Sequence, residues 1–267
     1  MMTRSQLAKV RLWQYSERGA VNAFVNELIN QNGAKILTKL LNGKGFSGLI
    51  GQNLVVNSLD HVLVEFSLSE CGNPDAILLL KAQSRDDSKE QRVALFIEAK
   101  AKGFKKEKTL LREFLGDGTS CLKKQVTREL ELGGRIENWK SHNNFLTMRR
   151  SLRIGEVIDG QLRKIPDSKP VSKYLINMLW EYSAKWYVIG LIPGDGRPVY
   201  QKMSDYWKSR YSNDSTQLSR VFARFGILTW GQVSREFPGD NCLTQTLKLN
   251  GDQVYSKPRG NRAKIAR

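Results

Sequence analysis

The sequence is poor in the residues that bind transition metals and form disulfides. Its 267 residues include only two histidines and three cysteines, and Cys71, Cys121 and Cys242 lie far apart in the chain. An odd number of widely spaced cysteines fits neither a disulfide framework nor a CxxC zinc site. Zinc hydrolases and other enzymes built on several histidines need more nitrogen or sulfur ligands than this chain has. Any catalysis must therefore depend on carboxylates, lysines or hydroxyl groups.

Long apolar segments are also missing. The longest fully apolar runs, such as 76–80, are far shorter than the roughly 18 residues that a membrane span needs. Residues 1–15 do not form the apolar stretch of a secretory signal, because Gln6, Lys9 and Arg11 interrupt it. Hydrophobic residues still make up 40% of the chain, which is enough for a folded core. We therefore expect a folded cytoplasmic protein without a membrane span.

Acidic residues are few relative to basic ones. The chain has 26 Asp and Glu against 43 Lys and Arg, a formal net charge of +17 at pH 7. Residues 256–267 contain five basic residues and no acidic one, and Lys257, Arg259 and Arg262 are among the five. The positive electrostatic potential of such a chain attracts polyanions, of which DNA and RNA are the most common in cells. The sequence thus predicts a nucleic-acid partner, although a basic surface exposed only to solvent stays open as an alternative.

The hydrophobic spacing predicts an α/β protein with a mixed central sheet flanked by helices. A helix is expected at 16–30 and three strands follow it, so an antiparallel meander packed on that helix is the simplest topology. We expect a single domain over 1–255, with a core region at 16–132, an insertion or substrate-facing lobe at 133–172, a second part of the core at 173–255, and a basic tail at 256–267. The predicted elements are strands at 61–68, 75–82 and 92–100 with a polar loop at 83–91, a helix at 110–132 interrupted near 116–118, a helix at 171–183, a strand at 185–192, a helix near 204–210 and a strand at 225–229.

Charged residues occur at the ends of two of these predicted strands. Pro74-Asp75 opens the second strand, and Glu98-Ala99-Lys100 closes the third. Side chains alternate along a strand, so Glu98 and Lys100 share one face. We expect Asp75 and Glu98 to converge at one edge of the sheet, where two carboxylates suit Mg²⁺ or Mn²⁺ and an ammonium group can act on a water molecule.

The context of the Glu-x-Lys motif makes it informative. Motifs of this length arise by chance, and Asp87-Ser88-Lys89 and Asp167-Ser168-Lys169 are two similar cases in this chain. Neither of these lies at the end of an apolar strand. Only Glu98-Ala99-Lys100 does so and is also preceded by a Pro-Asp that opens another strand. Taken singly, Asp75 could still be a turn residue, and Glu98 and Lys100 an exposed ion pair.

The order of helix, three strands, Pro-Asp and Glu-x-Lys over residues 16–132 resembles the PD-(D/E)xK nuclease superfamily, which has the restriction-endonuclease-like fold. This resemblance implies a metal-dependent phosphodiesterase. It further implies that Asp75 and Glu98 bind the metal, that the carbonyl group of Ala99 adds a ligand, and that Lys100 assists the attacking water.

The resemblance also suggests where to look for further functional residues. Members of the superfamily often have another acid on the first helix, and Glu17 fits best because it shares a helix face with apolar residues, with Glu27 as the second choice. Some members use a Gln on the helix after the Lys, which would be Gln125. The basic residues directly downstream of the motif either contact phosphates or form a solvated charge run; they include Lys102, Lys105 and Lys106.

The leading hypothesis is a Mg²⁺-dependent endonuclease that hydrolyses DNA, in the class of restriction, mobile-element and defence nucleases, with Mn²⁺ as a substitute metal. The alternatives are a protein on the same fold that binds nucleic acid without cutting it, and a nuclease that acts on RNA. The sequence leaves open whether the protein acts as a homodimer or with other proteins.

Overall fold

The computed structural model describes most of the chain between residues 17 and 249. The described residues are 17–43, 46–48, 53–64, 74–84, 87–101, 114–116, 121–141, 155–158, 161–164, 178–182, 185–237 and 239–249. In this part of the chain no helix is long and apolar enough to cross a membrane.

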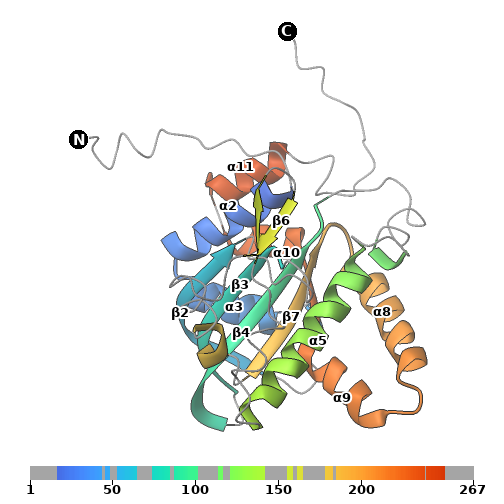
Figure 1. Cartoon of the computed structure of the whole chain (residues 1–267). Helices are drawn as coiled ribbons and strands as arrows, with labels where there is room; N and C mark the ends of the chain where they lie inside the picture. The colour runs from blue at the N-terminus through green and yellow to red at the C-terminus, as the bar shows by residue number, and fades with distance from the viewer. Residues whose placement is uncertain are drawn as a thin grey trace.

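A six-stranded mixed sheet forms the centre of the structure, in the order β1-β8-β7-β4-β3-β2 (Figure 1). Neighbouring strands in β2-β3-β4 are antiparallel, β7 is parallel to β4, β8 is parallel to β7, and β1 is antiparallel to β8. The predicted α/β class, mixed sheet and antiparallel meander are confirmed. The strands are β1 (Ser47–Gly48), β2 (Leu54–Val64), β3 (Ala76–Ser84), β4 (Asp87–Ala99), β7 (Lys185–Ile192) and β8 (Phe225–Thr229).

Helices cover both faces of the sheet, as expected for a sheet whose strands are apolar on both sides. One face packs against α2 (Glu17–Asn30), α3 (Gly33–Asn42), α10 (Trp230–Glu236) and α11 (Cys242–Leu249). The other face packs against α5 (Leu122–Ser141), α8 (Gly196–Arg210) and α9 (Ser215–Arg224). Figure 1 shows α5 crossing in front of the sheet, with α8 and α9 beside it.

The side chains of β3 and β4 alternate between two hydrophobic clusters. Leu78 and Leu95 belong to the cluster on the α2 side, and Leu79 and Phe96 belong to the cluster on the α5 side. Both central strands are therefore buried on both faces, which explains the unbroken apolar run at 76–80. Because the side-chain period is two, Glu98 lies on the same side as Phe96 and faces α5.

Two strand boundaries differ from the prediction. β2 begins at Leu54, before the predicted start, because Leu54 and Val56 are buried in the core next to α3. The predicted polar loop at 83–91 is wrong, since β3 continues to Ser84 and β4 begins at Asp87. Lys89 and Glu90 are exposed there, so this end of the hairpin is a polar extension of the ladder beyond the buried core.

The helices were predicted less completely than the strands. The helix at 16–30 is confirmed as α2, and the strands at 185–192 and 225–229 are confirmed as β7 and β8. α5 runs on to Ser141, so residue 133 lies inside this helix, and α8 starts at Gly196, well before the predicted helix near 204–210. The prediction missed α3, α9, α10 and α11. Within the predicted lobe, β5 (Gly155–Ile158) and β6 (Gln161–Lys164) form an antiparallel hairpin.

Candidate active site

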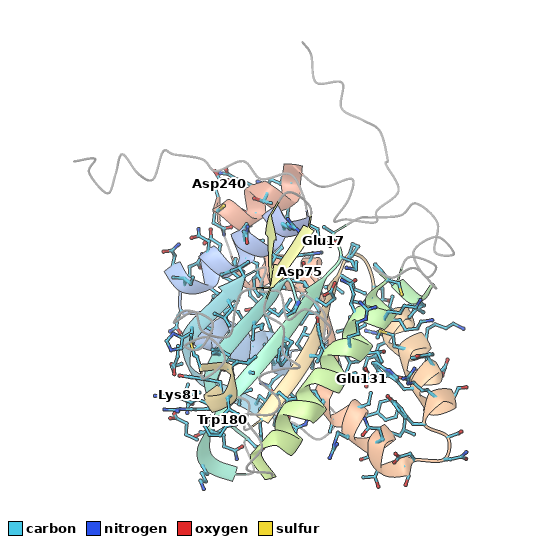
Figure 2. The ribbon with its side chains drawn as sticks, viewed as in Figure 1. Glu17, Asp75, Lys81, Glu131, Trp180 and Asp240 are labelled. Carbon is cyan, nitrogen blue, oxygen red and sulfur yellow. The ribbon has the colours of Figure 1, made fainter. Side chains whose placement is uncertain are left out.

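Two acidic side chains anchor the backbone directly after Glu98. The backbone N–H of Ala99 donates a hydrogen bond to Asp75 Oδ2 at 2.7 Å, and the N–H of Ala101 donates one to Glu17 Oε2 at 2.9 Å. Asp75 lies just before β3, and Glu17 is the first residue of α2. Figure 2 shows both residues at the same end of the central strands. Asp75 and Glu17 thus both hold the backbone that directly follows Glu98.

The backbone of Lys100 is held from two further elements. Its N–H donates to the Leu191 carbonyl of β7 at 2.8 Å, which continues the parallel ladder beyond Ala99. Its carbonyl accepts a hydrogen bond from Trp230 Nε1 at 3.0 Å. Trp230 is fully buried at the start of α10, whose capping box fixes the first turn. The position of Lys100 is therefore set by residues far from it in the sequence.

The side chains of Glu98 and Lys100 form a buried ion pair. Lys100 Nζ lies 2.7 Å from Glu98 Oε1 and 3.6 Å from Glu17 Oε1, and the Glu98 side chain is only 1% exposed. Ala76 pairs with Ile97 in the antiparallel register, which places Asp75 opposite Glu98 at the end of the two strands. An exposed cross-strand ion pair, the alternative that the sequence left open, does not describe this arrangement.

The two strand carboxyl groups have strongly perturbed acidities. Burial raises the pKa of Asp75 to about 6, and the Glu17 carboxylate adds to this, while the hydrogen bond from Ala99 acts in the opposite direction. Burial raises the pKa of Glu98 to about 7, the Asp75 charge contributes in the same sense, and Lys100 opposes it. Burial and the mutual repulsion of the carboxylates therefore outweigh the nearby Lys100 charge in both groups.

Lys100 responds in the opposite way to the same surroundings. Burial alone would lower the pKa of its ammonium group, but the Glu98 and Glu17 carboxylates outweigh burial and hold the pKa above its usual value. Lys100 is therefore a fixed positive charge at neutral pH. It can stabilise a developing negative charge or hold a proton, and it cannot act as a free base.

Sequence reasoning missed one acidic residue near this group. Glu129 of α5 is 1% exposed, and burial together with the Glu98 carboxylate raises its pKa well above the usual value. It lies one helical turn after Gln125, which the sequence did single out, and the amide oxygen of Gln125 is buried without a hydrogen-bond partner. The sequence contained a sign of this burial, because Glu129 shares the buried side of α5 with Leu122, Val126 and Leu130.

Glu27, the second choice for the helix acid, has a different position. Its Oε1 accepts the backbone N–H of Cys242 at 2.8 Å, at the first residue of α11, and its Oε2 accepts a hydrogen bond from Gln31 at 2.7 Å. Glu27 thus joins α2 to the start of α11, where a negative charge is favourable. Of the two candidates, Glu17 is the one that reaches Lys100.

Several predicted nucleic-acid contacts lie outside the described residues, so the structure says nothing about their positions. They are Lys102, Lys105, Lys106, Lys257, Arg259 and Arg262.

The oxygen donors at this site fit a hard divalent cation. In the part of the chain that the structure describes, no three His, Cys, Asp or Glu side chains form a ready ligand set. Asp75 and Glu98 supply two carboxylates, and Glu98 Oε2 is buried without a hydrogen-bond partner. Such an oxygen is energetically costly unless a donor or a cation binds it. Carboxylate and carbonyl oxygens are the ligands that Mg²⁺ and Mn²⁺ prefer.

Comparison with known proteins adds no assignment to this geometry: no family model matches the chain, and neither a curated protein nor a solved structure does.

Proposed function

We propose that the protein is a metal-dependent endonuclease that hydrolyses phosphodiester bonds of DNA. The observation that carries the proposal is the convergence of Asp75, Glu98, Lys100 and Glu17 at the end of β4, with Glu98 and Lys100 joined in a buried ion pair. A strand carboxylate, a Glu-x-Lys pair and a helix acid on a mixed sheet resemble the PD-(D/E)xK arrangement, with Mg²⁺ as the natural metal.

Each of these residues has a role that follows from its position. Asp75 and Glu98, with the Ala99 carbonyl, would hold the cation, which when bound polarises the phosphate and lowers the pKa of a water molecule. Lys100 places a permanent positive charge beside Glu98, where it can stabilise the negative charge that develops during hydrolysis. Glu17 orients the Lys100 ammonium group and the backbone of Ala101.

The charge of the chain supports a nucleic-acid substrate. A net charge of +17 favours association with a polyanion over association with a small neutral molecule. Lys123 and Lys124 lie in the first turn of α5. This turn is close to Glu98 in the sheet, because the preceding residue, Leu122, packs next to the Gly190 backbone and Gly190 pairs with Glu98. The first turn of α5 therefore adds positive charge at this end of the sheet, although the Lys123 ammonium group itself lies over the Tyr206 ring at 5.0 Å.

The proposal is tested by incubating the full chain with matched DNA and RNA duplexes and single strands, in Mg²⁺ or in EDTA. We expect DNA to be cut internally in Mg²⁺ and to remain intact in EDTA. Cleavage of RNA alone would change the substrate class. Binding of DNA without cleavage in either Mg²⁺ or Mn²⁺ would replace the nuclease with a binding protein on the same fold, and cleavage that persists in EDTA would contradict metal dependence.

A further inference from the structure

The buried side of α5 brings a further carboxyl group to Glu98. Gly133 allows α5 to lie directly against β7, because a Cβ atom there would stand 2.2 Å from the Trp186 ring. Toward the other end of the contact, Leu122 packs next to the Gly190 backbone, and Gly190 is paired with Glu98 in the sheet. Glu129 lies between these two contacts, on the helix face that packs on β4 and β7.

Three buried oxygen atoms of β4 and α5 lack donors. Glu98 Oε2, Glu129 Oε2 and Gln125 Oε1 are all buried and have no hydrogen-bond partner. The carboxyl groups of Glu98 and Glu129 lie within hydrogen-bonding reach of each other when one of them holds a proton, and the charges of Asp75 and Lys100 also act on Glu129. Glu129 is therefore an almost fully buried carboxyl group aimed at the Asp75 and Glu98 site with a free oxygen.

The charge balance of this corner is negative when its acids are ionised. Glu17, Asp75, Glu98 and Glu129 stand against the ammonium group of Lys100 and the guanidinium group of Arg18, whose charge also acts on Asp75. A buried carboxylate needs a proton or a positive partner. A proton shared by Glu98 and Glu129 would satisfy only those two groups, because the amide oxygen of Gln125 does not hold a proton at neutral pH. A cation would satisfy both carboxylates and the amide oxygen together.

We propose that Glu129 is a further metal ligand, which binds the divalent cation together with Glu98 from the α5 side, with the amide oxygen of Gln125 as a neutral donor beside it. The inference rests on the proposed function, because it extends the metal site assigned there. The proposed role of Glu129 differs from those of Asp75 and Ala99, which reach the metal site from the ends of β3 and β4. It also explains why a carboxylate occurs on the buried side of α5.

The test measures Mn²⁺ binding by the metal-free full chain in the absence of DNA, by calorimetry or by the electron spin resonance of free Mn²⁺ at pH 8. The variant is Glu129→Gln, which keeps the size of the side chain and removes its charge. The matched control is Glu131→Gln on the same helix, whose carboxylate is 45% exposed and ion-paired with Arg210. Figure 2 shows Glu131 on α5. Asp75→Asn serves as the benchmark for a ligand of the proposed site.

We expect Glu129→Gln to weaken Mn²⁺ binding at least about tenfold, the range seen when a group that supports a metal site is lost. Glu131→Gln should bind within twofold of the parent chain. The rise in melting temperature that Mn²⁺ causes should shrink in Glu129→Gln but not in Glu131→Gln.

Three results would overturn the inference. If Glu129→Gln binds Mn²⁺ like the parent while Asp75→Asn binds weakly, Glu129 is only a hydrogen-bond partner of Glu98, and the proposed function stands. If the parent chain does not bind Mn²⁺ at all, both the inference and the proposed metal dependence fail. If circular dichroism shows Glu129→Gln to be unfolded, Glu129→Asp, which shortens the side chain by one methylene, takes its place, and an unchanged Mn²⁺ affinity in that variant counts against the inference.

Discussion

Replacing Glu98 with Gln should make the metal-free protein more stable at pH 8, although it removes a residue of the candidate active site. Burial and the Asp75 charge raise the pKa of Glu98 from 4.5 to about 7 in the folded chain. Above pH 7 the group is ionised in both the folded and the unfolded state, and the folded state disfavours that ionisation. Below about pH 4.5 the group is neutral in both states and imposes no such penalty.

The size of the effect follows from the shift in pKa. Each pKa unit corresponds to about 1.4 kcal/mol, so the ionised Glu98 carboxylate should reduce the free energy of unfolding by about 3 kcal/mol at pH 8. Folded protein binds more protons than unfolded protein between pH 4.5 and 7, so this contribution falls as the pH rises through that window and stays constant above it. Glu98→Gln resembles the neutral form at every pH and should not show this loss.

The assay is equilibrium unfolding by urea in EDTA, at pH 4.5 and at pH 8, for the parent chain, Glu98→Gln and the control Glu131→Gln. We expect Glu98→Gln and the parent to be similar at pH 4.5 and to differ by about 3 kcal/mol at pH 8, with the variant more stable. The exposed Glu131 pair should change the free energy of unfolding by less than about 1 kcal/mol. Added Mn²⁺ should stabilise the parent and not Glu98→Gln. A Glu98→Gln chain that is less stable at pH 8, or a difference that does not depend on pH, would refute the reasoning.

Three further changes probe other parts of the site and the chain. Lys100→Ala should retain Mn²⁺ binding but lose about 10²-fold or more in single-turnover cleavage rate, the usual range for one positioned catalytic group, and cutting within twofold of the parent would remove Lys100 from the mechanism. Trp230→Phe removes the N–H that donates to the Lys100 carbonyl and leaves a buried acceptor unpaired, which should lower the free energy of unfolding by about 1–3 kcal/mol. Chemical denaturation measures this change. An unchanged free energy of unfolding would mean that another donor replaces the indole. Truncation after Tyr255 removes the five basic residues of the tail. The slope of log DNA affinity against log salt concentration should become shallower by a few units, while the cleavage pattern stays the same. An unchanged slope would show that the tail does not bind phosphates.

The convergence of Asp75, Glu98 and Lys100 could be predicted because it depends on local patterns. Glu98 and Lys100 follow the apolar run at 93–97, and Asp75 precedes the apolar run at 76–80 of the strand that pairs with it in a hairpin. Side chains alternate along a strand, so Glu98 and Lys100 share one face, and antiparallel pairing brings Asp75 opposite Glu98. The position of Glu17 near this group could also be anticipated, because the resemblance calls for an acid on the first helix and Glu17 shares a helix face with apolar residues.

Other parts of the site depend on contacts that no local pattern contains. Glu129 meets Glu98 only because Gly133 lets α5 lie close to Trp186, and Trp230 reaches the Lys100 carbonyl from far along the chain. α3 was missed because it follows α2 almost directly and starts at a glycine, which sequence patterns treat as a break. The stretch at 83–91 resembles a loop in sequence because polar residues extend the hairpin, and Lys89 and Glu90 in it are exposed.

The central claim is that Glu98 belongs to a metal-dependent hydrolytic site, and one comparison tests it most directly: cleavage of supercoiled plasmid DNA in Mg²⁺ by the parent chain and by Glu98→Gln. The metal-free variant is expected to be at least as stable as the parent at pH 8, and urea unfolding of both chains in the Mg²⁺ buffer shows whether a loss of activity comes from unfolding. The account predicts nicked and linear products with the parent and intact plasmid with Glu98→Gln at the same concentration. Equal cleavage by the two chains would contradict it.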